Sequence, residues 1–311
     1  MNSSFADPES SSLLNDGRNI DAIRAPRISF LIPYFGRWPF WMPLFLESCR
    51  YNPDIDWLFF SDCDVPANLP TNVRIQCIAY ADYCALVSER LDIDFRPENP
   101  YKLCDLRPAL GYIHEESLAN CDFWAFGDID IIYGRLRKFF NNQRLQRYDL
   151  ISNHARRISG HLCLIRNTPR MNNLFKIIPD WQQRFCGPHQ ALDEGAFSRL
   201  FLWRKNFPMP LFKFVGLFNP LRRKSIFLEA YSTPNASIRW TDGSKNFPLR
   251  WFWRKGRLTN DKDGQREFPY LHFMVWKNEW RSQPDPTPET IRQLVQQHNW
   301  QINAQGFGEI V

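Results

Sequence analysis

Short apolar segments bounded by proline, glycine or acidic residues recur through the first half of the chain. Residues 27–36 (RISFLIPYFG), 55–64 (IDWLFFSDCD) and 73–80 (VRIQCIAY) each contain such a run. Apolar runs of this length between breakers are typical of strands that are buried on both faces, as in a parallel sheet. Residues 122–134 (DFWAFGDIDIIYG) carry the same pattern. The sequence therefore predicts four buried strands.

Helical segments separate these strands. Residues 38–52, 80–92 and 101–121 are predicted helices, and the first of them would have Pro39 in its first turn, where proline is tolerated. Strands that alternate with helices indicate βαβ units and a mostly parallel sheet with helices on both faces. We therefore expect an α/β fold whose ligands bind beyond the carboxyl ends of the strands.

The pattern changes after residue 150. Residues 148–168 predict two more short strands, residues 192–201 begin a helix, and residues 268–277 (FPYLHFMVWK) predict a late strand. Thr287, followed by Pro288, is the predicted N-cap of a C-terminal helix.

Composition agrees with a globular protein that has a sizeable core, because 44% of the residues are hydrophobic and 12 are tryptophan. Residues 1–26 are rich in Ser, Asp and Asn, which predicts a flexible tail, and they lack the charged and apolar regions of a signal peptide. The sequence contains no apolar run of about 18 or more residues, which argues against a transmembrane helix. The eight scattered cysteines, without a CxxC pair, favour a reducing, cytoplasmic setting.

Two aspartates, one residue apart, interrupt the aromatic strand predicted over residues 122–134. On an extended strand, Asp128 and Asp130 would point to one face with Cα atoms roughly 6.5–7 Å apart, while Ile129 would face the sheet. Unpaired carboxylates are costly to bury, and oxygen ligands suit Mg²⁺ or Mn²⁺ held together with substrate phosphates. We predict such a metal site; a turn or a helix cap at the strand end is the alternative.

These segments resemble a known group of enzymes. The stretch FGDIDIIYG resembles the DxD signature of nucleotide-sugar glycosyltransferases with the GT-A fold. Other segments between residues 28 and 277 resemble a bacterial family found with cell-surface polysaccharide genes and catalogued as a domain of unknown function. The resemblance implies a GT-A-like (Rossmann-type) fold in one domain over 27–311, with a nucleotide-binding half (27–150) and an acceptor-binding half (151–311).

The resemblance also assigns residues to the nucleotide-sugar donor. The loop after the first strand would hold the base and ribose, the end of the second strand would hydrogen-bond the base, and the helix before the DxD motif would touch phosphate, ribose or sugar. The loop residues are Pro33, Tyr34 and Phe35, and the residue at the end of the second strand is Asp62. The helix residues are Lys102, Asp105 and Arg107. A solvated helix face is the alternative interpretation of Lys102 and Arg107.

A late histidine completes the predicted metal site. His272, in YLHFMVWK, resembles the third metal ligand of related GT-A enzymes, and imidazole suits Mn²⁺. Lys277 would neutralise the diphosphate, although Met274, Val275 and Trp276 stand where better-known families have a glycine-containing turn. A hydrogen-bonded core histidine is the alternative for His272.

Two acids at the start of a helix are the catalytic candidates. Asp193 and Glu194 either complement the helix dipole or bind the acceptor and act as a general base on its hydroxyl. By resemblance, Gly160 and His161 face the pocket beneath the donor sugar.

Positive charge is concentrated in one region. Residues 201–257 hold 12 Lys/Arg and two acids, so this segment carries +10 and the rest of the chain −4. Within it, residues 201–224 interleave Lys and Arg with bulky apolar residues, which is typical of an element that contacts anionic lipid headgroups. A loop-rich subdomain with solvated basic residues is the alternative. A single-strand nucleic-acid platform is a third, but no nucleic-acid module matches.

The sequence thus favours a metal-dependent glycosyltransferase of hexosyltransferase type, using Mn²⁺ or Mg²⁺. It would move a sugar from a nucleotide diphosphate, UDP by resemblance, to a surface polysaccharide or lipid-linked glycan at the inner membrane face. A catalytically inactive module of the same fold that binds a glycan or a partner is the alternative. A metal-dependent phosphohydrolase would need further clusters of His and Asp.

Overall fold

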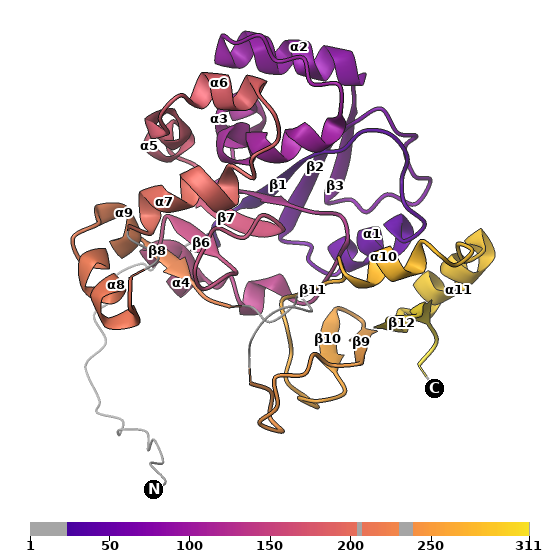
Figure 1. Cartoon of the computed structure of the whole chain (residues 1–311). Coiled ribbons are helices and arrows are strands. Elements are labelled where there is room, and N and C mark those ends of the chain that lie inside the picture. The colour runs from indigo at the N-terminus through magenta and orange to yellow at the C-terminus, as the bar shows by residue number, and fades with distance from the viewer. Residues whose placement is uncertain (1–23, 204–206, 230–238, 311) are drawn as a thin grey trace, which may run out of the picture.

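A seven-stranded sheet forms the centre of the computed structural model, which describes residues 24–203, 207–229 and 239–310 (Figure 1). Its strands are β1 (Ile28–Pro33), β2 (Ile55–Ser61), β3 (Val73–Cys77), β4 (Phe123–Gly127), β6 (Leu150–Ser152), β7 (Leu162–Arg166) and β8 (Ser225–Phe227). Their order is β3-β2-β1-β4-β7-β6-β8. All neighbouring pairs are parallel except those that β7 forms with β4 and β6.

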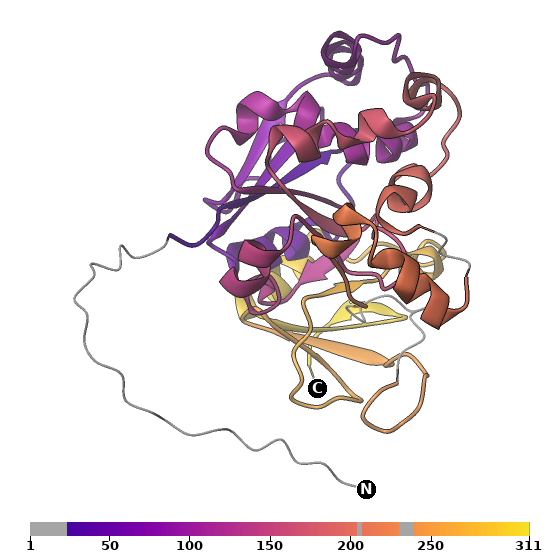
Figure 2. The same cartoon turned by 90° about the vertical axis from the view of Figure 1, so that its left-hand side faces the viewer.

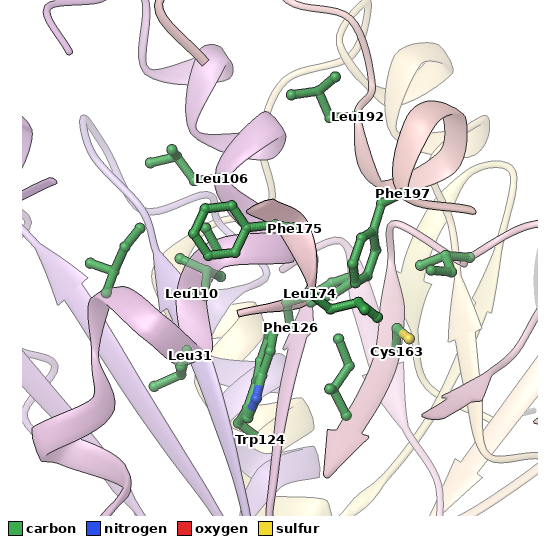
Figure 3. Close-up of a cluster of buried hydrophobic side chains, with 14 of the residues drawn as sticks. Leu31, Leu106, Leu110, Trp124, Phe126, Cys163, Leu174, Phe175, Leu192 and Phe197 are labelled. Carbon is green, nitrogen blue, oxygen red and sulfur yellow. The ribbon is translucent and has the colours of Figure 1, made fainter. Parts of the chain in front are cut away.

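The central strands are apolar on both sides because helices cover both faces of the sheet. Along β4, Trp124 and Phe126 enter one hydrophobic cluster, whereas Phe123 and Ala125 enter a second cluster on the other face. This alternation follows from the two-residue period of a strand. Figure 3 shows Trp124 and Phe126 among side chains from the helical layer, including Phe175. The continuous apolar pattern that predicted buried strands therefore reflects two cores.

Two helical layers build these cores with the sheet (Figures 1 and 2). The first contains α2 (Tyr80–Leu91), η1 (Pro100–Ala109), α3 (Leu110–Ile113), η2 (Glu115–Leu118), α5 (Pro169–Asn172), η4 (Leu174–Ile177), α6 (Trp181–Cys186), η5 (Asp193–Phe197) and α7 (Ser198–Phe201). The second contains α1 (Met42–Arg50), η3 (Leu136–Lys138) and α4 (Asn142–Arg147). The predicted α/β class, with a mostly parallel sheet flanked by helices, is confirmed.

Two smaller antiparallel sheets follow. One pairs β5 (Ile131–Tyr133) with β11 (Tyr270–His272), and the other has the order β10-β9-β12-β13. The second consists of β9 (Arg250–Arg254), β10 (Arg257–Asn260), β12 (Asn299–Asn303) and β13 (Gly306–Gly308). Trp253 and Trp300 stack at its centre with ring centroids 3.9 Å apart. Helices α10 (Trp276–Trp280) and α11 (Pro288–Gln297) pack with these two tryptophans in a third hydrophobic cluster. Helices α8 (Met209–Gly216) and α9 (Pro220–Arg223) lie near β8.

The structure corrects three predicted elements. The strand over 122–134 is broken, because β4 stays in the large sheet while β5 pairs with β11, and the chain bends over Asp128–Asp130 between them. The helix over 101–121 is a succession of short turns that starts as the 3₁₀ helix η1, where Pro108 removes a backbone donor from an α-helical ladder. The strand over 268–277 is three residues long and is followed by α10.

Other local predictions hold, except for the position of Pro39. The remaining predicted strands are present, and Thr287 caps α11 by accepting the N–H of Thr290 at 3.2 Å. Pro39 lies before α1, whose first turn contains Pro43 instead. Residues 1–23 of the predicted tail lie outside the described residues. Within the described chain, all eight cysteines are free thiols and no helix has the length and apolarity needed to span a membrane.

Candidate active site

A cavity of about 840 Å³ opens at the carboxyl ends of β1 and β4. Its wall comes from the end of β1, from η1, from the bend between β4 and β5, from residues 154–161 and 189–194, and from α10. Strands β1 and β4 are parallel neighbours, so their carboxyl ends meet at one edge of the sheet. The cavity therefore lies where an α/β sheet binds its ligands.

Asp128, Asp130 and His272 meet in this cavity. One potential ligand atom from each residue lies within 4.8 Å of the other two. His272 Nε2 is 3.4 Å from Asp130 Oδ1 and 3.7 Å from Asp128 Oδ2. The bend after β4 brings in the two aspartates, and β11 brings in His272 by pairing it with Ile131 of β5. Two carboxylates and an imidazole form a donor set that suits Mn²⁺.

Two cations neutralise the aspartates. Arg107 donates hydrogen bonds to Asp128 and, at 3.0 Å, to Asp193 Oδ2. Lys277, from the first turn of α10, donates to Asp130. Burial alone would raise the pKa of Asp130, but His272 and Lys277 outweigh it and hold that pKa below its ordinary value. Burial raises the pKa of Asp128, although Arg107 opposes this shift. The site therefore combines a carboxylate pair with two adjacent cations.

The loop after β1 is held at one end of the cavity. Pro33, Tyr34 and Phe35, which the resemblance assigns to the base and ribose, line the wall. The Tyr34 ring stacks on Trp38 with centroids 5.0 Å apart, and burial, with the nearby Cys63 and Asp130, raises the pKa of Tyr34 to about 12. These contacts give the loop a fixed aromatic surface.

Asp62 supports this loop without lining the cavity. Its Oδ1 accepts the N–H of Gly36 at 2.9 Å. Gly36 has a φ of +114°, a conformation that side-chain-bearing residues rarely adopt. Asp62 therefore shapes the loop, and we do not retain it as a residue that contacts the base of the nucleotide sugar.

Lys102 and Asp105 are also directed away from the cavity. Lys102 Nζ lies 2.8 Å from Asp105 Oδ2, and both side chains are buried. Both residues also bond to backbone groups: Lys102 to the carbonyl oxygens of Arg184 and Pro188, and Asp105 to the N–H groups of Gln190 and Leu192. The His189 side chain lies close as well, with Nδ1 3.4 Å from Asp105 Oδ1. The pair fastens the segment 184–192 to η1, so neither residue is retained as a donor contact. Of the three residues predicted on this helix, Arg107 alone lines the cavity.

Asp193 and Glu194 begin the π-helical turn η5 and differ in environment. Asp193 is buried and paired with Arg107, whereas the Glu194 side chain is 31% exposed and pairs with Arg157 at 3.0 Å. Burial raises the pKa of Glu194 above its ordinary value, and Arg157 opposes the shift. Asp193 therefore positions Arg107, and Glu194 is the carboxylate of the two that is open enough to meet a ligand.

Gly160 and His161 both line the cavity. A Cβ on Gly160 would lie 2.6 Å from Arg107 Nη1 and 2.8 Å from Asp193 Oδ2, so the absence of a side chain lets this ion pair form. His161 stacks on His272 with ring centroids 4.4 Å apart, and its Nε2 is 2.8 Å from the Tyr270 hydroxyl. Burial lowers the pKa of His161 well below its ordinary value, which favours the neutral imidazole.

Several wall residues were not predicted. Tyr101 and His189 lie in contact with ring centroids 4.6 Å apart, and Arg157 and Trp41 complete other parts of the wall. Trp41 Nε1 donates to the carbonyl of Ile129 at 3.0 Å and so fixes the bend between the two aspartates. The basic stretch HARR (154–157) was the available signal for Arg157. Tyr101 had none, because an aromatic residue beside a proline is common in loops.

Comparison with known proteins gives one family and several distant structures. The profile described as "Family of unknown function (DUF6625)" matches residues 30–300. No curated protein matches the sequence.

The galactosyltransferase LgtC in complex with donor and acceptor sugar analogs is 14% identical, with 65% of this chain and 84% of that chain covered and a TM-score of 0.34. An active-site mutant of LgtC is 13% identical, with 87% and 95% covered and a TM-score of 0.42. Mouse xyloside xylosyltransferase 1 is 9% identical, with 67% and 87% covered and a TM-score of 0.31. Likenesses at this level leave the function to be argued from the site.

Proposed function

This chain belongs to DUF6625, a family of unknown function, and we propose that it is a metal-dependent glycosyltransferase. The reaction would move a sugar from a nucleotide diphosphate, with UDP the favoured nucleotide by resemblance, to a glycan or lipid-linked saccharide. The observation that carries the proposal is the cluster of Asp128, Asp130 and His272 in a cavity at the carboxyl edge of the sheet. The resemblance of FGDIDIIYG to a DxD motif supports the same chemistry.

Asp128, Asp130 and His272 would hold Mn²⁺ or Mg²⁺. Their mixed oxygen and nitrogen donor set, with ligand atoms within 4.8 Å of one another, fits such an ion. When bound, the ion would neutralise the negative charge that develops on a diphosphate leaving group.

Lys277 and Arg107 supply fixed positive charge at the same place. Each is paired with one of the aspartates, so each lies within reach of an anion that approaches them. Preorganised cations stabilise charge that develops in a transition state without further reorganisation. We assign both to the diphosphate, and we assign Pro33, Tyr34 and Phe35 to the base and ribose.

The acceptor would enter on the side of Glu194. This carboxylate lines the cavity, is partly exposed, and has a raised pKa, which suits a group that takes a proton from an acceptor hydroxyl. Asp193 is buried against Arg107 and positions that side chain. Glu194 is therefore the proposed general base.

Thermal shift against a panel of nucleoside diphosphates, with and without Mn²⁺, tests the donor site. A ligand at about 100 times its Kd stabilises the native state by about 2.7 kcal/mol. We expect a shift with one nucleotide that requires Mn²⁺ and is lost in Asp130→Ala. Asp285→Ala, which removes an exposed carboxylate elsewhere, is the matched control and should shift like the wild type.

Turnover separates an enzyme from a binding module of the same fold. Wild-type protein should release nucleoside diphosphate from the matching nucleotide sugar when an acceptor is present. Metal-dependent nucleotide binding without turnover on any acceptor would favour the inactive module. A folded protein that binds none of the nucleotides would contradict the proposal.

A further inference from the structure

Helix α8 lies at the edge of the molecule, where Figures 1 and 2 both show it in orange. Phe212 faces inward, is 8% exposed, and has the Arg156 guanidinium 6.0 Å from its ring centroid. After the helix, Asn219 is fully buried, and its Nδ2 donates to the carbonyl of Leu200 at 2.8 Å. These two anchors fix which side of the segment faces solvent.

The outward side of this segment is apolar. Leu211, Phe214, Leu217 and Phe218 are 45%, 57%, 65% and 67% exposed. The rings of Phe214 and Phe218 contact each other at 5.3 Å between centroids, so they form one continuous patch. Scattered single apolar residues are ordinary on a protein surface, but contiguous ones mark a contact surface. We call these four side chains the α8 patch.

The segment that carries the α8 patch is cationic. Residues 207–228 contain four Lys/Arg and no acidic residue. Lys213, Arg223 and Lys224 are exposed, whereas Arg222 turns inward to donate to the carbonyl of Ser225 at 2.9 Å. Exposed apolar rings and exposed cations in one segment that has no carboxylate complement an anionic lipid surface, because the rings can enter the headgroup boundary while the cations meet the phosphates.

We propose that the α8 patch docks this protein on an anionic bilayer. Helix α8 adjoins the cavity wall through residues 154–157, because His154 and Arg157 line the cavity while the Arg156 guanidinium lies over the ring of Phe212 on the inward side of α8. Docking would bring the cavity wall that carries Arg157 and Glu194 to the membrane surface, where a lipid-linked acceptor resides. This choice of acceptor rests on the proposed function, whereas the docking does not.

Sedimentation with sucrose-loaded vesicles tests the docking on the full chain, without nucleotide or metal ion. We expect binding to phosphatidylcholine vesicles that contain phosphatidylglycerol, weakening as salt is added, and little binding to phosphatidylcholine alone. Phe214→Ser with Phe218→Ser should weaken binding about ten-fold for each ring. Lys213→Gln, Arg223→Gln and Lys224→Gln should each weaken it about five-fold.

The matched control replaces exposed apolar residues on other surfaces. Ile177 and Leu249 are 62% and 75% exposed, and Ile177→Ser with Leu249→Ser should bind vesicles like the wild type. A folded wild type that does not sediment, or that binds neutral vesicles equally well, would overturn the proposal. The proposal would also be overturned if the wild type did not bind vesicles and instead formed a concentration-dependent dimer that Phe214→Ser with Phe218→Ser converts to monomers.

The two proposals fail separately. Loss of vesicle binding in the α8 variants should leave the Mn²⁺-dependent nucleotide shift unchanged, because the substituted side chains do not line the cavity. Conversely, Asp130→Ala should bind vesicles like the wild type.

Discussion

Lys102 Nζ lies 2.8 Å from Asp105 Oδ2, with side chains that are 6% and 0% exposed. The pair is local in sequence, but its remaining hydrogen bonds reach the segment 184–192, which leads directly into Asp193 and Glu194. A buried ion pair thus holds the chain that presents the proposed base.

Removing one partner of this pair should destabilise the protein strongly. Asp105→Asn leaves the Lys102 ammonium buried without a counter-charge, which typically costs about 3–5 kcal/mol. Chemical denaturation of both proteins measures the difference.

An exposed pair provides the control for Asp105→Asn. Arg96 Nε and Asp94 Oδ1 lie 2.6 Å apart with side chains 84% and 74% exposed, so Asp94→Asn should cost less than about 1 kcal/mol. Equal effects of the two substitutions would show that burial gives the Lys102–Asp105 pair no special importance.

Gly160→Ala should impair turnover more than it impairs folding. The new Cβ would meet Arg107 and Asp193 at 2.6 and 2.8 Å, so the ion pair must shift. Misplacing a catalytic group by about 1 Å can lower kcat/KM about 100-fold. Steady-state kinetics on the substrate pair found by the turnover screen provide the measurement.

Gly195→Ala is the glycine control. Outside its own turn, its Cβ would meet the Gln190 carbonyl at an ordinary 3.8 Å. We expect near wild-type kinetics from it. If Gly160→Ala and Gly195→Ala have the same kinetics, the close approach of Arg107 and Asp193 to Gly160 is not needed for turnover.

Glu194→Gln should abolish the acidic limb of the pH–rate profile. A general base acts only when deprotonated, and burial raises the pKa of Glu194 above 4.5, so wild-type activity should fall as the pH drops through that raised value. Glutamine cannot take the proton, so the residual activity should be low and independent of pH in this range. An unchanged profile would remove Glu194 from the proposed role.

His114, which does not line the cavity, should make the fold sensitive to acid. It stacks on Phe60 with ring centroids 3.8 Å apart, and its Nε2 is 2.9 Å from the Tyr83 hydroxyl. Burial, followed by the charge of Arg90, lowers the pKa of His114 from 6.5 to about 3.

Between these pH values the unfolded chain binds a proton at His114 and the folded chain does not. The free energy of unfolding should therefore fall with decreasing pH, by about 1.4 kcal/mol per unit from this group alone. Denaturation of His114→Gln between pH 7 and pH 4 should show a shallower loss. A parallel loss in both proteins would mean that His114 titrates normally.

The sequence predicts those parts of the site that follow from local patterns. The apolar strands place the aspartates at a sheet edge, and the resemblance of YLHFMVWK to a late segment of GT-A enzymes points to His272. The bend over Asp128–Asp130 is not local, since it depends on the pairing of β5 with β11 far along the chain. The inward orientation of Lys102 is not local either, because its acceptors come from the segment 184–192. The periodicity of apolar residues predicts which face of a helix or strand is buried. It does not predict which residues far along the chain will contact that face.

The pairing of Tyr133 with Tyr270, at the ends of β5 and β11, has a consequence for how the protein is made. Contacts between residues so far apart in sequence give the cluster a high contact order and are closed late in folding. A ribosome extends the chain from the N-terminus, so Asp128 and Asp130 emerge well before His272. The three proposed ligand side chains therefore come together only after the C-terminal segment has docked. In a nascent chain, a divalent ion would therefore meet only the carboxylates of Asp128 and Asp130. The imidazole of His272 would begin to favour one ion over another only in the completed fold.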